Sequence, residues 1–218
     1  QSGGPGAKLA EKNLSVPEGE SREYTSVNST YNLSVSRQNV TVKSSDESVF
    51  TTEIITKAGS NSWDPTDIVD KIKINGLSKG TGTLTIDVNG TAWSCPVVIT
   101  SEDDAVTAVK LSQETAELPV GESLTLTADY TPVTAAVTVE WSSSDDGVAT
   151  VENGVVTAQS TGSAVITAAV TDAKGNTVKA SCEVTVEEVP YTVELYVPKN
   201  TVGEDGLHLY PAAGFDAD

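Results

Sequence analysis

The stretch Leu124-Thr125-Leu126-Thr127-Ala128 alternates apolar with polar residues, and this period of two decides the fold class. The same period recurs in residues 83–88, 137–141 and 184–186. Such alternation places one face of a strand on a core and the other in water. Val, Thr and Ile dominate these runs, and these residues suit a pleated, half-buried surface. The pattern therefore predicts an all-β protein.

Turn-forming residues separate the alternating runs at intervals of about 8–12 residues, which is typical of an antiparallel sandwich. Asn89-Gly90 and Asn153-Gly154 each lie between two such runs. They predict two-residue hairpins, because these turns need positive φ at both central residues. No stretch predicts a long amphipathic helix. The best candidate for a single helical turn is Asp67-Ile68-Val69-Asp70-Lys71.

The sequence also repeats itself, which predicts two copies of one fold. The matching blocks keep the same order: 19–21 with 121–123, 42–49 with 141–148, 79–85 with 161–167, and 93–97 with 180–184. The spacing between matches falls from 99 residues (Asp46 to Asp145) to 82 residues (Gly80 to Gly162). The first copy therefore carries about 17 extra residues near 54–71, which we expect to form a loop.

The second copy resembles the group 2 bacterial immunoglobulin-like domain, the module of intimin- and invasin-type surface proteins. The residues that carry the resemblance are 118–128, 141–145, 148–151, 154–158, 162–168 and 180–186. The first copy resembles the same family less closely. Val42 stands where the family has a Trp, and the first copy carries the insertion, so it resembles a divergent member.

The resemblance implies two tandem immunoglobulin-like antiparallel β-sandwiches, residues 7–101 and 105–187, joined by a short polar linker. Residues 1–6 are expected to be a flexible leader. Residues 190–218 are expected to be a C-terminal strand extension or a partial third module. Since the chain has no initiator Met and no apolar signal segment, we expect a processed or cut fragment.

The charge balance excludes several classes of partner. The 218 residues hold 13 Lys+Arg and 31 Asp+Glu, a net charge of −18. No basic stripe is present to neutralise phosphates, so we expect no binding to nucleic acid.

No apolar run approaches about 18 residues, which argues against direct membrane insertion. Residues 1–103 contribute −4 and residues 104–218 contribute −14, a self-repelling surface that favours a monomer.

Few residues can do chemistry. One His and two Cys exclude most metal sites and most pairs of nucleophile and base, so we expect no enzyme, no catalytic residue and no cofactor. Cys95 and Cys182 occupy equivalent positions in the two copies, about one domain length apart and beyond disulfide reach. We expect two buried thiols instead, and Trp141 as part of the core between the sheets. Asp145 is expected to cap a turn rather than to form half of a calcium site.

We expect the insertion to be the segment that carries a function specific to this protein, because functional residues are common on loops held by a rigid scaffold. It contains Trp63, Asp64, Asp67 and Asp70. A Trp in a polar loop can anchor a sugar or a protein. The three acids can gather calcium weakly, although they lack the spacing of an EF-hand loop. The alternative is a loop that folds back on its own sheet and packs Trp63 locally.

The family resemblance implies a bacterial protein located outside the cell or on its surface. It implies a non-catalytic stalk or spacer that acts in adhesion, with a host or bacterial surface protein or a glycan as partner. The alternative is an accessory or carbohydrate-binding region of a larger secreted polysaccharide-active enzyme. The family has no shared catalytic residues, so none is assigned to this chain.

Overall fold

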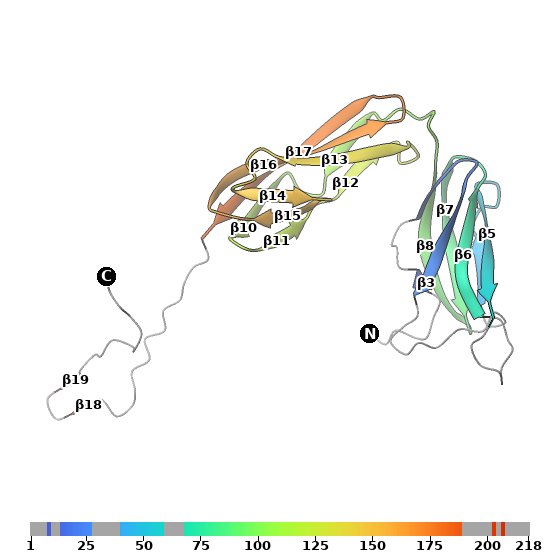
Figure 1. Ribbon diagram of the computed structural model, residues 1–218, viewed down its shortest axis with the longest axis horizontal. Coiled ribbons are helices and arrows are strands. Elements are labelled where there is room, and N and C mark those ends of the chain that lie inside the picture. Colours follow the sequence, from blue (N-terminus) through green and yellow to red (C-terminus); the bar gives the residue numbers. More distant parts are fainter. Residues whose placement is uncertain are drawn as a thin grey trace.

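The computed structural model describes residues 8–9, 14–27, 40–58, 68–188, 202–203 and 206–207. Every regular element in these ranges is a β-strand, as the sequence predicts (Figure 1). Within them, no helix is long and apolar enough to cross a membrane. The buried apolar side chains form two separate clusters. One cluster lies among the described residues of 8–100, which are termed the first module, and the other lies among residues 101–188, which are termed the second module.

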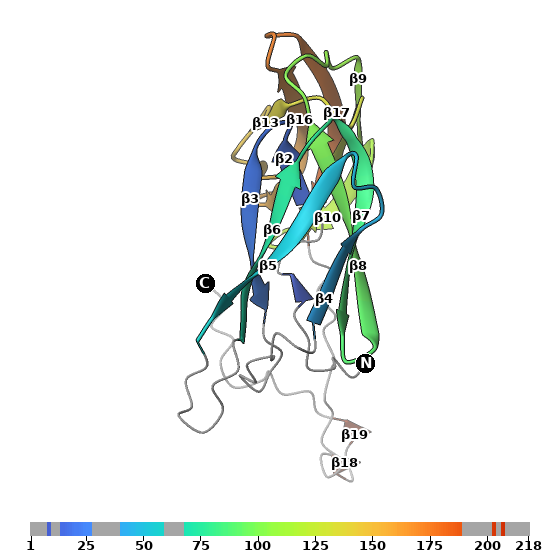
Figure 2. The same cartoon turned by 90° about the vertical axis from the view of Figure 1, so that its right-hand side faces the viewer.

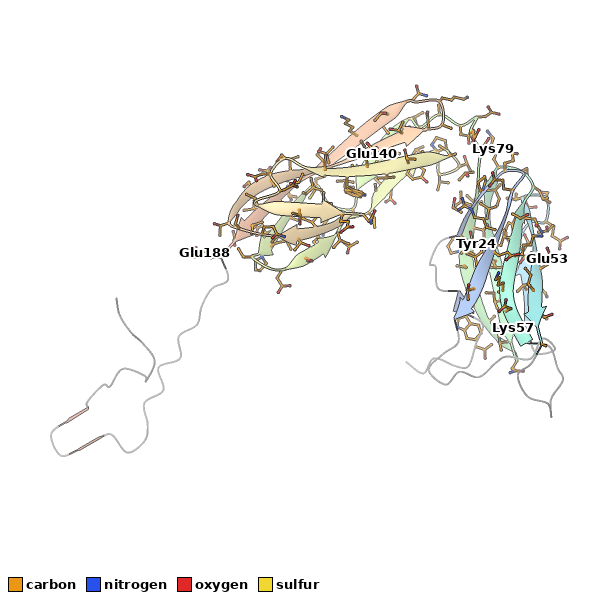
Figure 3. All side chains as sticks on the ribbon, viewed as in Figure 1. Tyr24, Glu53, Lys57, Lys79, Glu140 and Glu188 are labelled. Atoms are coloured by element: carbon orange, nitrogen blue, oxygen red, sulfur yellow. The ribbon has the colours of Figure 1, made fainter. Side chains whose placement is uncertain are left out.

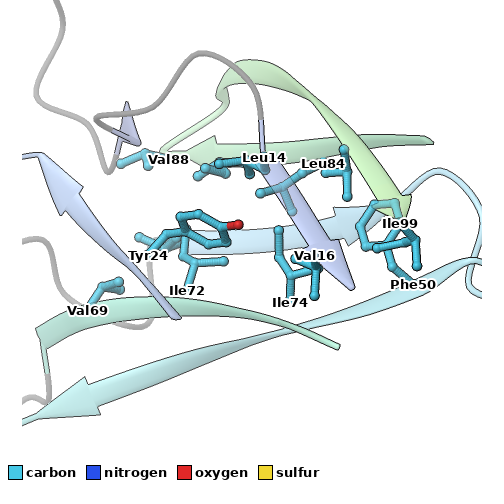
Figure 4. Close-up of a cluster of buried hydrophobic side chains, with 13 residues drawn as sticks. Leu14, Val16, Tyr24, Phe50, Val69, Ile72, Ile74, Leu84, Val88 and Ile99 are labelled. Carbon is cyan, nitrogen blue, oxygen red and sulfur yellow. The ribbon is translucent and has the colours of Figure 1, made fainter. Parts of the chain in front are cut away.

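Two four-stranded sheets build the first module (Figure 2). One sheet has the order β1 (Lys8–Leu9), β3 (Ser21–Val27), β6 (Ile68–Gly76), β5 (Phe50–Lys57). The other has the order β2 (Leu14–Pro17), β8 (Thr91–Thr100), β7 (Gly80–Val88), β4 (Val40–Ser44). Phe50, Ile72, Leu84 and Ile99 are buried in the cluster between these strands (Figure 4). Buried residues recur at every second position of a strand, as Ile72 and Ile74 do in β6, which explains why one face of each sheet is apolar.

The second module has one large sheet and two smaller ones. The large sheet has the order β10 (Thr115–Pro119), β17 (Thr177–Glu187), β16 (Gly162–Asp172), β13 (Val137–Ser143). A three-stranded sheet has the order β11 (Ser123–Thr125), β15 (Val155–Ala158), β14 (Ala149–Glu152). The last sheet pairs β12 (Ala128–Thr131) with β9 (Ala108–Leu111). In both modules an early strand runs parallel to the last one, β2 beside β8 and β10 beside β17, while the other pairs are antiparallel.

The turns show the internal repeat at the level of hydrogen bonds. Asp46 Oδ1 accepts the Ser48 N–H at 2.9 Å, and Asp145 Oδ1 accepts the Gly147 N–H at 2.9 Å. Asp145 thus caps a turn, as the sequence predicts. The serine before each aspartate also has the same role, because its hydroxyl oxygen accepts a strand N–H at 2.8 Å: Ser45 from Thr83 and Ser144 from Val165.

The two predicted hairpin turns are confirmed. Asn89 and Gly90 have φ of 54° and 83°, and Asn153 and Gly154 have φ of 50° and 83°. Positive φ at both central residues matches the twist of the flanking strands, which explains the choice of Asn-Gly at each turn.

The stretch from Leu124 to Ala128 is not one strand. β11 ends at Thr125 and β12 begins at Ala128 in a different sheet. Between them, Leu126 is only 2% exposed and its N–H donates to the Gly154 carbonyl at 2.8 Å. The chain bends here to change sheets, which sandwiches commonly do at bends. The alternation persists across the bend, so the sequence pattern does not reveal it.

The helical turn suggested at residues 67–71 is wrong, because Ile68 to Lys71 belong to strand β6. The insertion is also less of a loop than expected. β5 has 8 residues and β6 has 9, whereas the hairpin of β14 and β15 has 4 residues in each strand. Both ends of the insertion therefore lengthen a hairpin, and residues 59–67 lie outside the described ranges.

The ends of the chain are described only in part. β18 (Val202–Gly203) pairs with β19 (Gly206–Leu207). The expected leader at 1–6 and most of residues 190–218 lie outside the described ranges, so the predictions for these segments stay predictions.

Candidate functional site

The structure places only one of the four candidate ligand contacts. Trp63, Asp64 and Asp67 lie outside the described residues, and the ligand and calcium predictions for them stay predictions. Asp70 is the extra residue of a bulge in β6, because Ile55 pairs with Lys71 and Thr56 pairs with Val69. A bulge re-aims its side chain.

The carboxylate of Asp70 is held by a strand neighbour. Lys57 Nζ lies 2.8 Å from Asp70 Oδ1. The hydrogen bond from Lys57 lowers the pKa of Asp70. This carboxylate thus accepts a hydrogen bond from a lysine of the same hairpin. The pair lies near the point where the described part of the hairpin ends.

The three residues expected in the cores differ in burial. Trp141 is partly buried and packs against the second cluster, where its ring covers Gly154. Cys182 is fully buried in the same cluster, and burial raises the pKa of its thiol. Cys95 packs against the first cluster but remains partly exposed. Neither cysteine forms a disulfide.

The most elaborate set of polar contacts lies where the chain passes from the first module to the second. Thr100 and Ser101 are 8% and 6% exposed, which is unusual for polar residues. The Thr100 carbonyl accepts the Glu18 N–H of the first module at 2.8 Å. The next residue already belongs to the second module, because the Ser101 N–H donates to the Thr134 carbonyl at 2.8 Å. A parallel bridge between Ser101 and Ala135 continues this contact.

Asp104 joins the two modules through its side chain, which is 14% exposed. Its Oδ1 lies 2.5 Å from Nζ of Lys79, in the turn between β6 and β7 of the first module. Its Oδ2 accepts a hydrogen bond from the Thr134 hydroxyl of the second module at 2.5 Å. The hydrogen bonds from Lys79 and then from Thr134 lower the pKa of Asp104, so the carboxylate is ionised at neutral pH.

A buried carboxylate fixes the linker from the side of the second module. Asp172, 5% exposed, accepts hydrogen bonds from the N–H groups of Val106, Lys174 and Asn176, each at 2.9 Å, and from the Asn176 amide. Burial raises the pKa of Asp172, but the hydrogen bonds from Asn176 and from the backbone outweigh burial and lower the pKa to about 2. Lys174 Nζ adds a hydrogen bond to the Asp103 carbonyl at 2.6 Å.

Two recesses flank this junction. One, of about 400 Å³, lies between Pro17 and Arg22 of the first module and Tyr130 and Asp172 of the second. The other, of about 440 Å³, has four acidic residues among those that line it: Glu18, Glu20, Glu102 and Asp103. Within the described ranges, no group of three or more His, Cys, Asp or Glu side chains is placed to hold a metal ion. The arrangement can position two modules.

Sequence reasoning predicts only a polar linker at residues 101–104 and misses Asp104 and Asp172 as its supports. A signal for Asp172 is present, since Asp172-Ala173-Lys174-Gly175-Asn176 has the composition of a turn in which an Asp caps backbone N–H groups. No local signal identifies Asp104, because its partners Lys79 and Thr134 are 25 and 30 residues away.

Comparisons with known proteins support the family resemblance predicted for the second module. Residues 105–184 match the model of the family described as bacterial Ig-like domain (group 2). An uncharacterised protein of Clostridium acetobutylicum is 39% identical over 116 residues, which are 50% of this chain and 12% of that protein. The 3-O-alpha-D-galactosyl-alpha-L-arabinofuranosidase of Bifidobacterium longum subsp. longum is 44% identical over 93 residues, 39% of this chain and 8% of the enzyme. The chain thus spans a small part of the curated relatives it matches.

The chain also aligns with solved structures, at low identity. Domains 5–6 of the S-layer protein SbsC align with 84% of this chain and 97% of their own, at 17% identity and a TM-score of 0.34.

Proposed function

We propose that the chain is a non-catalytic spacer of an exported bacterial surface protein, and that it presents an adhesive part of that protein to its partner. The partner would be a host or bacterial surface protein or a glycan. The observation that supports this most is the junction, where hydrogen bonds from both modules hold the connecting chain. The match of residues 105–184 to the bacterial Ig-like family points the same way.

The faces of the modules suit a spacer as well. On the outer face of the large sheet of the second module, short hydroxyl side chains pair across strands, Thr167 with Ser181 at 3.0 Å and Thr171 with Thr177 at 2.9 Å. On the first module, Lys71 pairs with Glu23 at 2.9 Å and Lys73 with Glu53 at 3.1 Å. At these positions the two faces present polar groups that are already paired within their own module.

An exchange experiment in the full-length protein tests the spacer role. The segment is replaced by an unrelated tandem sandwich of similar length, or it is deleted. We expect the exchange to retain cell adhesion and the deletion to weaken it, because a spacer contributes length and not recognition. If the exchange abolishes adhesion as fully as the deletion does, the segment itself binds the partner and the spacer proposal is wrong.

The second candidate is an accessory region of a secreted polysaccharide-active enzyme. The match to the arabinofuranosidase favours it, although that match covers 8% of the enzyme. β5 ends at Lys57, at the end of the first module away from Lys79 (Figure 3), and residues 58–67 follow it in the sequence. Trp63 lies in this segment.

Glycan-array binding distinguishes this candidate. The chain and its Trp63→Ala variant are compared, with Leu77→Ala as control, because Leu77 is 50% exposed and lies beside the turn that holds Lys79. Binding that disappears in Trp63→Ala and persists in Leu77→Ala would support a glycan-binding role. No binding by the unaltered chain, or equal loss in both variants, would count against it.

A further inference from the structure

We propose that the junction is a hinge of a single peptide link and that the ion pair of Lys79 with Asp104 latches it, so that the two modules keep one fixed angle. This goes beyond the spacer role, because a spacer can be either jointed or rigid. The proposal rests on which residues of the linker are held, and by which module.

The hinge is short because hydrogen bonds hold two consecutive residues, one in each module. Thr100 is the last residue of β8 and accepts the Glu18 N–H within the first module. Ser101 pairs with the second module through Thr134 and Ala136, at 2.8 and 3.2 Å. The modules can therefore swivel only about the bonds between these two consecutive residues, because Thr100 is held by the first module and Ser101 by the second.

The rest of the linker belongs to the second module. Val106 donates its N–H to the buried carboxylate of Asp172, and the Asp103 carbonyl accepts a hydrogen bond from Lys174. Both partners lie at the hairpin between β16 and β17. Residues 101–106 thus move with the second module, and Asp104 is carried on its surface toward the first.

Asp104 supplies the contact that stops the swivel. Its two oxygens divide between the modules, Oδ2 on Thr134 and Oδ1 on Lys79. The partner turn is itself held, because the Lys79 N–H donates to a carboxylate oxygen of Glu18 at 3.1 Å. A single link allows rotation about its own axis, and a second contact displaced from that axis removes this freedom. The carboxylate of Asp104 is 14% exposed and the Lys79 side chain is 51% exposed. Because both groups are charged, their hydrogen bond is stronger than one between neutral groups.

Pulsed electron paramagnetic resonance on the full chain tests the latch. Spin labels are placed at Glu53 and Glu140, one exposed residue on each module (Figure 3), in a background where Cys95 and Cys182 are changed to Ala. We expect a narrow distribution of label distances in this background. Asp104→Ala should broaden the distribution, because the off-axis contact is lost while both cores stay intact.

Asp103→Ala is the matched control. It removes the same charge one residue away, and the hydrogen bond at residue 103 uses the backbone carbonyl, which the variant keeps. We expect its distribution to stay narrow. Lys79→Ala should broaden the distribution as Asp104→Ala does, and the double variant should be no broader than either one, because the two residues act as one contact.

Two results would overturn the latch. One is a broad distribution before any change at the junction, and the other is a distribution that Asp103→Ala broadens as much as Asp104→Ala. Thermal melting of each variant shows whether both modules remain folded, so a loss of structure is not mistaken for a freed hinge. The exchange experiment on the full-length protein is independent of the angle. A jointed chain can therefore still be a spacer, and the two proposals fail separately.

Discussion

The carboxylate of Asp172 accepts five hydrogen bonds and is almost completely buried. Its pKa of about 2 lies below the ordinary value of 3.8, so folding favours the ionised form. The stabilisation is fully present above pH 3.8 and is lost as the pH falls toward 2, because the unfolded chain then takes up the proton first.

Asp172→Asn should therefore lower the melting temperature of the second module by several degrees at pH 7, since an amide group turns a donor toward backbone N–H groups. The difference from the unaltered chain should shrink between pH 4 and pH 2, as the wild-type carboxylate is neutralised. Melting curves over this range measure both effects. Asp129→Asn, at an exposed position of β12, is the control and should melt like the unaltered chain. A melting temperature of Asp172→Asn that equals the control at pH 7 would refute the role of this carboxylate.

The two Asn-Gly turns give a second test at this scale, because their glycines have the same φ and different surroundings. A Cβ at Gly90 would meet nothing within 4 Å, whereas a Cβ at Gly154 would collide with the Leu126 carbonyl and lie 3.2 Å from the Trp141 ring. Both alanine variants carry the cost of a left-handed backbone, about 1–2 kcal/mol. Gly154→Ala adds the collision and should lose clearly more free energy of unfolding in chemical denaturation. Equal losses would show that the packing of Trp141 over the turn is not as tight as described.

At the scale of elements, the sequence predicts strands and turns well but not the changes between sheets. The alternation in residues 83–88 and 184–186 falls within β7 and β17, and both Asn-Gly turns have the expected φ. Leu124 to Ala128 alternate equally well and yet divide between two sheets. Alternation shows which side chains face a core, and a bend between sheets keeps that order.

The pairing of Lys79 with Asp104 could not be predicted from the sequence either, because it depends on how the two modules are placed relative to each other.

The strands β3, β6 and β5 carry a row of charges that makes an element-scale prediction. Lys73 of β6 faces Glu23 of β3 and Glu53 of β5 in register, and its Nζ lies 3.1 Å from Glu53. Lys73→Glu places three like charges side by side, which is destabilising in a sheet. We expect a lower melting temperature of the first module at low salt and a partial recovery at high salt, because salt screens exposed charges.

The charge-swapped pair Lys73→Glu with Glu53→Lys controls for the loss of side-chain shape. It restores an attractive neighbour on β5 and should recover much of the stability. Circular dichroism melting at two salt concentrations measures all three chains. If Lys73→Glu is as stable as the unaltered chain at low salt, the row of charges contributes nothing to this sheet.

Over the whole molecule, charges of opposite sign are distributed unevenly. Residues 101–188 hold 15 acidic and 3 basic side chains, against 11 and 9 in residues 1–100. Every ion pair found among the described residues uses a lysine of the first module: Lys57, Lys71, Lys73 or Lys79. Repulsion among acids therefore dominates in the second module, while attraction contributes in the first.

Salt should consequently move the stabilities of the two modules apart. The Debye length falls from about 30 Å at 0.01 M to about 10 Å at 0.1 M, so added NaCl screens repulsion in the second module and ion pairs in the first. We expect the melting temperature of the second module to rise by a few degrees and that of the first to stay level or fall. Residue-resolved NMR of backbone amides, followed during heating, assigns each transition to its module. A double variant, Lys71→Gln with Lys73→Gln, removes two of the ion pairs and should make the first module less sensitive to salt.

Equal upward shifts of both melting temperatures in the unaltered chain would contradict the prediction. They would point to a general effect of salt on protein hydration, and the uneven distribution of charge would then have no part in stability.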